Sequence, residues 1–258
     1  MRTATWYFDF VSPFAYIGLH RLKELPADLS ITYKPVLFAG LLNHWGQKGP
    51  AELPTKRRYT YRISHWTATR LGLPFKFPAA HPFNPLHYLR LAIACGSKAE
   101  PIRAIFDDIW TTGADASSPE RFAALVKKLG AGEATPEVKD ILKKNTEEAA
   151  QRGVFGVPTF DVDGELFWGA DSIEFLKDFL KNPAVIENPE VQRLDNLPVA
   201  AARKVLRGSP GAAGPRSLLI LPEVFHYLAV VRQAACIHQL HFAAQLGDVA
   251  DRGHQRLG

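Results

Sequence analysis

The chain has 258 residues, of which 47% are hydrophobic and 22% are charged, and its formal net charge is +5. This size and composition suit a domain with a sizeable core and argue against wholesale disorder. The two cysteines, Cys95 and Cys236, lie too far apart for a CxxC redox pair or a zinc knuckle. Because the basic residues are spread along the chain, nucleic acid is not an expected partner.

The first elements form a β-α-β unit. Residues 4–11 alternate apolar and aromatic side chains and predict a buried strand. Ser12-Pro13 follows, and serine before proline is typical of a helix start, with apolar residues at helical spacing as far as Pro26. A second strand is predicted over residues 29–38. Such a unit implies a right-handed crossover and a parallel strand pair.

The middle of the chain has a helical pattern. Residues 43–56 are polar, contain Gly and Pro, and predict a loop. From about residue 54 to 151 the pattern is helical throughout. Ser118-Pro119 and Thr135-Pro136 are cap-then-proline helix starts inside this stretch.

Strands return after the helical stretch. Residues 159–162 and 165–168 are predicted strands, joined through Asp163-Gly164, a strong hairpin signal. Asp171-Ser172 is then expected to cap a final helix that runs to about Leu180. The order β-α-β, helices, β-β-α predicts an α/β protein with an interrupted thioredoxin-like plan.

The predicted division of the chain has three parts. Residues 1–44 and 152–205 form a discontinuous thioredoxin-like domain, and residues 45–151 form a helical insertion. Residues 206–258 contain no lysine and open on a Gly/Pro-rich linker. This tail is either helical or a segment with no selected role.

Neither a metal site nor a membrane span is expected. The histidines of residues 1–205 include no i, i+4 pair with a third ligand. There is no run of about 18 apolar residues and no leader pattern at the start, so we expect a cytoplasmic protein. The tryptophans are expected mostly in the core, with one or two lining an aromatic pocket: Trp6, Trp45, Trp66, Trp110 and Trp168.

Several separated motifs resemble one family. The segment FDFVSPFAY, residues 8–16, stands where thioredoxin-superfamily oxidoreductases carry CxxC, with Ser12 and Ala15 at the cysteine positions. The segment FGVPTF, residues 155–160, is similar to the superfamily's cis-proline loop. With RRYTYR, NPLHYLR and Gly169-Ala-Asp-Ser172, these motifs resemble the 2-hydroxychromene-2-carboxylate isomerases, relatives of kappa-class glutathione transferases. Over residues 1–205 the resemblance implies a DsbA-like thioredoxin fold with a large all-helical insertion, and glutathione as cofactor.

The position of Ser12 supports a glutathione site. The first turn of a helix has unpaired N–H groups and a partial positive charge, which stabilise a thiolate. A serine hydroxyl can donate one more hydrogen bond to that thiolate but cannot form a disulfide. From Ser-Pro alone a plain helix cap is the better interpretation, and the accompanying motifs reverse that preference.

Other candidate contacts to glutathione come with the resemblance. Val157, before Pro158, would pair with the cysteinyl backbone, and Asp171 with Ser172 would hold the γ-glutamyl end. In isolation the Asp171-Ser172 pair is better interpreted as a plain helix cap. Three further candidates are Gln47 in the polar loop, Lys56 in a basic helix start that continues with Arg57, Arg58 and Arg62, and Asn84 before Pro85. The alternative for the basic residues is a solvated helix face, and for Asn84 it is a helix cap.

The implied activity is interconversion of 2-hydroxychromene-2-carboxylate and trans-o-hydroxybenzylidenepyruvate in the breakdown of naphthalene-type compounds. Ser12 would activate the thiolate, and Lys or Arg would hold the substrate carboxylate. The alternatives are a kappa-like glutathione transferase or peroxidase, and a non-catalytic glutathione-binding protein. A thiol-disulfide oxidoreductase is disfavoured by the missing CxxC. The resemblance also suggests a homodimer acting on a small aromatic carboxylate.

Overall fold

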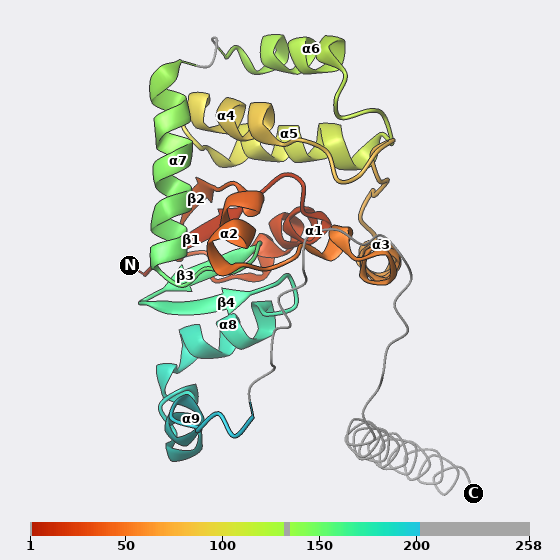
Figure 1. The fold of residues 1–258 in the computed structure, drawn as a ribbon. Coiled ribbons are helices and arrows are strands. Elements are labelled where there is room, and N and C mark those ends of the chain that lie inside the picture. The colour runs from red at the N-terminus through yellow and green to blue at the C-terminus, as the bar shows by residue number, and fades with distance from the viewer. Residues whose placement is uncertain (1, 132–134, 202–258) are drawn as a thin grey trace, which may run out of the picture. The chain divides into compact units, whose positions relative to one another are not determined.

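A four-stranded sheet carries the elements around it (Figure 1). Its strands are β1 (Thr3–Phe8), β2 (Ser30–Pro35), β3 (Thr159–Val162) and β4 (Glu165–Trp168), in the order β2-β1-β3-β4. β1 and β2 are parallel, whereas β3 pairs antiparallel with both β1 and β4. The sheet confirms the predicted β-α-β unit and the later hairpin, whose turn residues Asp163 and Gly164 both have positive φ.

The computed structural model describes residues 2–131 and 135–201. One compact unit reaches Leu197, and the second begins at Pro198. The helices and strands of the described residues all belong to the first unit. The predicted tail, residues 206–258, lies outside the described residues. The division of the first unit into a sheet domain and a helical insertion stays a prediction.

Helices fill the long connection between β2 and β3, as predicted, and follow β4. The helices of the described ranges are α1 Pro13–Arg21, α2 Phe38–Trp45, α3 Pro54–Arg70, α4 Leu86–Ala94, α5 Ala99–Thr111, α6 Pro119–Leu129, α7 Pro136–Gln151, α8 Ile173–Lys181 and α9 Pro189–Asp195. Short 3-10 helices cover Leu22–Glu24, Pro50–Glu52 and Pro183–Val185. None of these helices combines the length and apolar character needed to cross a bilayer.

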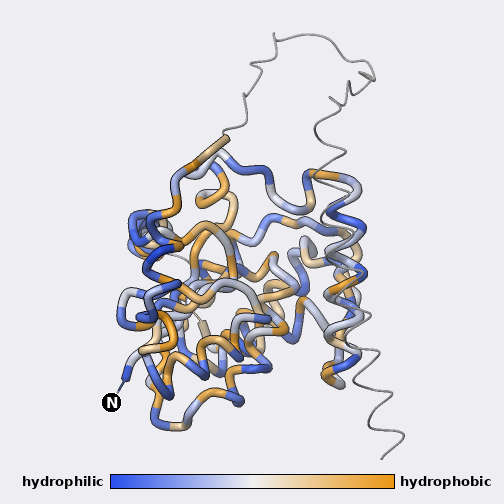
Figure 2. Tube along the Cα trace, turned by 90° about the horizontal axis from the view of Figure 1, so that it is seen from below, coloured by the Kyte–Doolittle hydropathy of each residue, from blue (hydrophilic) through white to orange (hydrophobic). Residues whose placement is uncertain are grey.

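Both faces of the sheet are covered, because β1 alternates between two cores. Trp6 and Phe8 stack on each other and join the larger core, which α1, α4, α5 and α8 complete. Tyr7 points to the other face and packs in a smaller core with residues of α2 and α7. Apolar and polar stretches accordingly alternate along the tube in Figure 2.

Both parallel strands end earlier than predicted. β1 ends at Phe8 rather than residue 11, and β2 ends at Pro35 rather than residue 38. The buried Asp9 carboxylate accepts hydrogen bonds from the backbone N–H groups of Val11 (3.0 Å) and Phe38 (2.8 Å). These N–H groups therefore bind a side chain instead of a neighbouring strand, and the chain turns at both places.

Two further expectations were wrong. The predicted loop over 43–56 instead contains the end of α2, a 3-10 turn and the first residues of α3. Trp6 and Trp110 are buried as expected, but Trp45, Trp66 and Trp168 are about half exposed (43%, 52% and 55%). Two of the five tryptophans, rather than most of them, therefore lie in the core.

Candidate active site

Ser12 occupies the N-cap of α1, in the turn that leaves β1. Its hydroxyl oxygen accepts a hydrogen bond from the Ala15 N–H at 3.2 Å, so the predicted cap is present. The same hydroxyl donates to the Val157 carbonyl at 3.3 Å, across 145 positions of sequence. Ser12 is buried and thus joins the helix start to the loop that precedes β3.

The loop before β3 has the geometry that the resemblance implied. The Val157–Pro158 peptide bond is cis. Pro158 lies beside α1, because a Cβ added at Gly18 would meet its ring at 3.4 Å. Within the described residues the Val157 N–H donates no hydrogen bond. One backbone donor of this loop is therefore free for a ligand.

The turn between β1 and α1 is fixed by three side chains, those of Trp110, His81 and Asp9. The Trp110 indole N–H donates to the Phe10 carbonyl at 3.0 Å. The His81 Nε2 lies 2.8 Å from the Val11 carbonyl, and the Asp9 carboxylate binds the Val11 N–H. His81 and Trp110 come from distant segments, 70 and 100 positions away from the carbonyls that they bind, so no local motif could have shown them. Together they hold the backbone that presents Ser12.

Two of these groups have pKa values shifted by burial. Burial raises the pKa of Asp9 to about 7, although the two backbone N–H groups that it binds act in the opposite direction. Burial also lowers the pKa of His81. A neutral His81 must carry its proton on Nε2, because the Val11 carbonyl beside this atom can only accept a hydrogen bond. The other ring nitrogen of His81, Nδ1, lies 2.9 Å from the Tyr61 hydroxyl.

Asp171 and Ser172 lie next to the cis-proline loop that precedes β3. The Gly169 N–H donates to the Pro158 carbonyl at 2.8 Å, and Ser172 donates from its hydroxyl to the Gly169 carbonyl at 2.8 Å. Ser172 is the N-cap of α8, the position predicted for it, although its side chain makes no capping bond. Asp171 is exposed. Its carboxylate is therefore available to a ligand.

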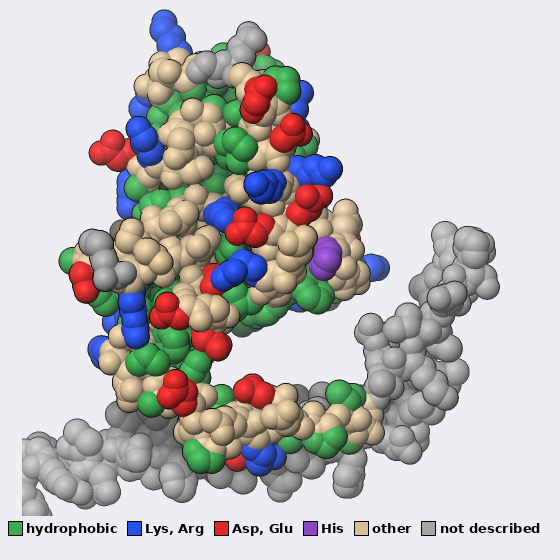
Figure 3. Space-filling model, turned by 90° about the vertical axis from the view of Figure 1, so that its left-hand side faces the viewer, with side chains coloured by type: hydrophobic (Ala, Val, Ile, Leu, Met, Phe, Trp, Pro, Cys, Tyr) green, Lys and Arg blue, Asp and Glu red, His purple; other side chains and the backbone are tan. Residues whose placement is uncertain are grey.

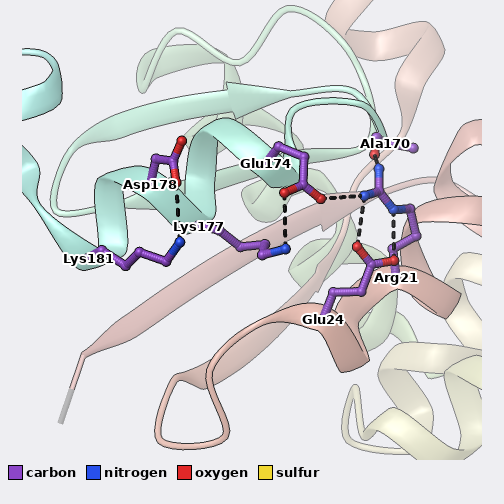
Figure 4. A network of polar contacts seen from close by, with 7 residues as sticks. All are labelled: Arg21, Glu24, Ala170, Glu174, Lys177, Asp178 and Lys181. Carbon is purple, nitrogen blue, oxygen red and sulfur yellow. Dashed lines mark hydrogen bonds and ion pairs between the residues drawn. The ribbon is translucent and has the colours of Figure 1, made fainter. Parts of the chain in front are cut away.

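An ion-pair network anchors the segment that carries Asp171 (Figure 4). Arg21, at the end of α1, donates to the Ala170 carbonyl at 2.7 Å. The same guanidinium pairs with Glu24 and with Glu174 of α8. The start of α8 is thus tied to the helix whose other end carries Ser12.

Within the described part of the chain, the remaining predicted residues make no hydrogen bond with Ser12. Gln47 and Lys56 are exposed, after α2 and in the first turn of α3 respectively. Asn84 is exposed, and its side-chain oxygen accepts from the Leu86 N–H at 3.1 Å, a local bond just before α4, whose N-cap is Pro85. The structure brings together Ser12, Val157 and Pro158, and connects them to Ser172 through Gly169.

The comparisons with known proteins agree on one family. The model of the DSBA-like thioredoxin domain matches residues 3–181. A 2-hydroxychromene-2-carboxylate isomerase of Pseudomonas putida is 30% identical over 67% of this chain and 91% of its own length. The chain belongs to the 2-hydroxychromene-2-carboxylate isomerase family, within the DSBA-like thioredoxin domains. This confirms the predicted fold class.

This isomerase-family chain is similar to two further proteins of known name. A solved structure of 2-hydroxychromene-2-carboxylate isomerase has a TM-score of 0.61 and 25% identity, covering 73% of this chain and 98% of its own. Glutathione S-transferase kappa 1 of Homo sapiens is 26% identical over 69% of this chain and 91% of its own length. The chain is therefore similar both to isomerases and to kappa-class transferases.

In this family member the cis-proline loop is shaped by an aromatic contact that gives a testable prediction. A Cβ at Gly156 would lie 2.5 Å from the indole Nε1 of Trp168. We expect Gly156→Ala to lower the free energy of unfolding by about 1–2 kcal/mol in urea denaturation, because the ring must move. In a Trp168→Ala background the same change should cost less than about 0.5 kcal/mol. Equal losses in both backgrounds would contradict the ring contact as the cause.

Proposed function

We propose that this protein is a glutathione-dependent isomerase that interconverts 2-hydroxychromene-2-carboxylate and trans-o-hydroxybenzylidenepyruvate. One observation carries the proposal: in a chain of this family, the hydroxyl of Ser12 lies at a helix start within hydrogen-bond reach of the cis-proline loop. Neither Ser12 nor Ala15 can exchange disulfides, so the site supports activation of an external thiol rather than redox chemistry by the chain's own residues.

The residues around Ser12 fit a cysteinyl backbone. The Val157 N–H is free to donate to a peptide carbonyl, and the Val157 carbonyl can accept from a peptide N–H, as in strand addition. In the structure that carbonyl accepts from Ser12 through a long bond of 3.3 Å. A peptide N–H that took the place of the Ser12 hydroxyl as donor to this carbonyl would leave that hydroxyl without an acceptor. Ser12 could then donate a hydrogen bond to a thiolate at the start of α1.

Charged residues would hold the two ends of the cofactor. Asp171 is exposed beside the cis-proline loop, where a carboxylate suits the ammonium of the γ-glutamyl end. Lys56 would hold a carboxylate of glutathione, and Gln47 and Asn84 would donate further hydrogen bonds to it. Bound glutathione would supply a thiolate that adds reversibly to the conjugated double bond, so that rotation takes place about a single bond.

The test is turnover with and without glutathione. We expect the purified protein to convert 2-hydroxychromene-2-carboxylate, followed by its ultraviolet spectrum, only when glutathione is present. We also expect glutathione to remain unconsumed, since the isomerase reaction returns it. Conversion at the same rate without glutathione contradicts the proposed dependence.

The similarity to kappa-class transferases gives the second candidate function a specific basis. A transferase keeps the thioether, so one glutathione would disappear for each product molecule. Measuring residual thiol after complete conversion therefore separates the two activities. We further propose that the protein is a cytoplasmic homodimer without nucleic-acid or membrane partners. Size-exclusion chromatography with light scattering tests whether it is a dimer.

A further inference from the structure

A second concave site lies away from Ser12, between α2, α4 and α7. Its volume is about 360 Å³, within the range of small-molecule pockets. Leu37 just before α2, Leu86 of α4 and Leu142 of α7 give it apolar walls. None of the residues that line it belongs to the Ser12 site, and the proposed function leaves it without a role.

The rim of this pocket is cationic. Arg90 of α4 and Lys139 and Lys143 of α7 line it, opposed by a single carboxylate, Glu147. Glu147 lies 3.9 Å from Lys143, so these two charges offset each other. Figure 3 shows the face on which α7 lies, where basic and acidic side chains stand side by side.

Arg90 and Lys139 are the uncompensated charges. Within residues 2–131 and 135–201, neither side chain takes part in an ion pair or a hydrogen bond. The Nε atom of Arg90 is also buried and without a partner in that part of the chain. A buried guanidinium donor without a partner costs free energy unless an acceptor approaches it, and a ligand in the pocket can supply one.

We propose that the α2–α4–α7 pocket binds a small amphipathic anion, an aromatic carboxylate or sulfonate, separately from the Ser12 site. The apolar body lies against Leu37, Leu86 and Leu142, and the anionic group accepts hydrogen bonds from Arg90 with Lys139 close by. Arg90 suits this role because a guanidinium presents a planar pair of donors to an oxyanion. The pocket thus combines an apolar volume with one oriented charge, as ligand sites commonly do.

The probe for this site is 1-anilinonaphthalene-8-sulfonate, whose fluorescence rises when it leaves water. With the full chain, we expect saturable binding that 1-naphthoate displaces and neutral 1-naphthalenemethanol displaces at least about tenfold more weakly. Arg90→Met should raise the dissociation constant about tenfold, and Lys139→Met should raise it by a smaller factor. Circular dichroism tests whether each variant is folded. If Arg90→Met does not fold, Lys139→Met still tests the proposal.

A matched control removes a charge elsewhere. Lys23 is exposed in the 3-10 helix that follows α1, and Lys23→Met should bind the probe as the wild type does. Saturating glutathione should not displace the probe, since the two sites are separate. Any one of four results overturns the proposal: an equal loss of probe binding in Lys23→Met, equal displacement of the probe by the neutral naphthalene, unchanged affinity in both Arg90→Met and Lys139→Met, or displacement of the probe by glutathione.

Discussion

Replacing Ser12 by alanine is expected to lower glutathione-dependent turnover about 100-fold. The hydroxyl is the side-chain donor placed at the start of α1, and its loss removes a hydrogen bond to an anion, the thiolate, that the site must stabilise. The measurement is kcat/KM at saturating glutathione. A second readout is the apparent pKa of the bound glutathione thiol, followed by thiolate absorbance, which should rise in the variant because the anion has lost a donor.

A cap elsewhere in the chain separates catalysis from helix stability. Ser118 caps α6 as Ser12 caps α1, accepting from the Arg121 N–H at 3.3 Å where Ser12 accepts from Ala15 at 3.2 Å. Each alanine variant should lose about 1 kcal/mol of stability from its missing cap. Only Ser12→Ala should lose turnover. Near-normal turnover in Ser12→Ala, or a comparable loss in Ser118→Ala, would remove Ser12 from the proposed chemistry.

Local signals in the sequence predicted most of the fold. Alternation gave β1, and Asp163-Gly164 gave the β3–β4 hairpin, because both depend on neighbouring residues. The start of α2 was missed because its cause is not local. The Phe38 N–H binds the Asp9 carboxylate, 29 positions away, and this contact replaces the continued strand.

The same reasoning applies to the candidate site. Ser12 and Val157 lie within motifs, and the structure joins them through one hydrogen bond. His81 and Trp110 lie in no motif, yet they bind the two carbonyls that precede Ser12. A lone histidine or tryptophan carries no sign of its partner in a single sequence. The support of a site is therefore harder to predict than its central residue.

Asp9 gives the second prediction, a dependence of stability on pH. The pKa of its carboxyl is raised from 3.8 to about 7 by burial, so between these values the folded chain holds a proton that the unfolded chain has released. Raising the pH then favours unfolding. The stabilising contribution of Asp9 to the free energy of unfolding is full below about pH 4 and is lost as the pH passes 7. Between these values it falls by about 1.4 kcal/mol per pH unit. Asp9→Asn, which does not titrate, should lack this slope.

The comparison is the difference in the free energy of unfolding between wild type and Asp9→Asn, measured in urea at pH 4, 5, 6, 7 and 8. We expect this difference to fall from pH 4 to 7 and then to level off. Asp28→Asn removes an exposed carboxylate before β2 and serves as the control, with a stability that follows the wild type at every pH. A constant difference between wild type and Asp9→Asn would show that Asp9 is ionised throughout. The two N–H groups that it binds would then outweigh its burial, and the turn that presents Ser12 would rest on a charged rather than a neutral carboxyl group.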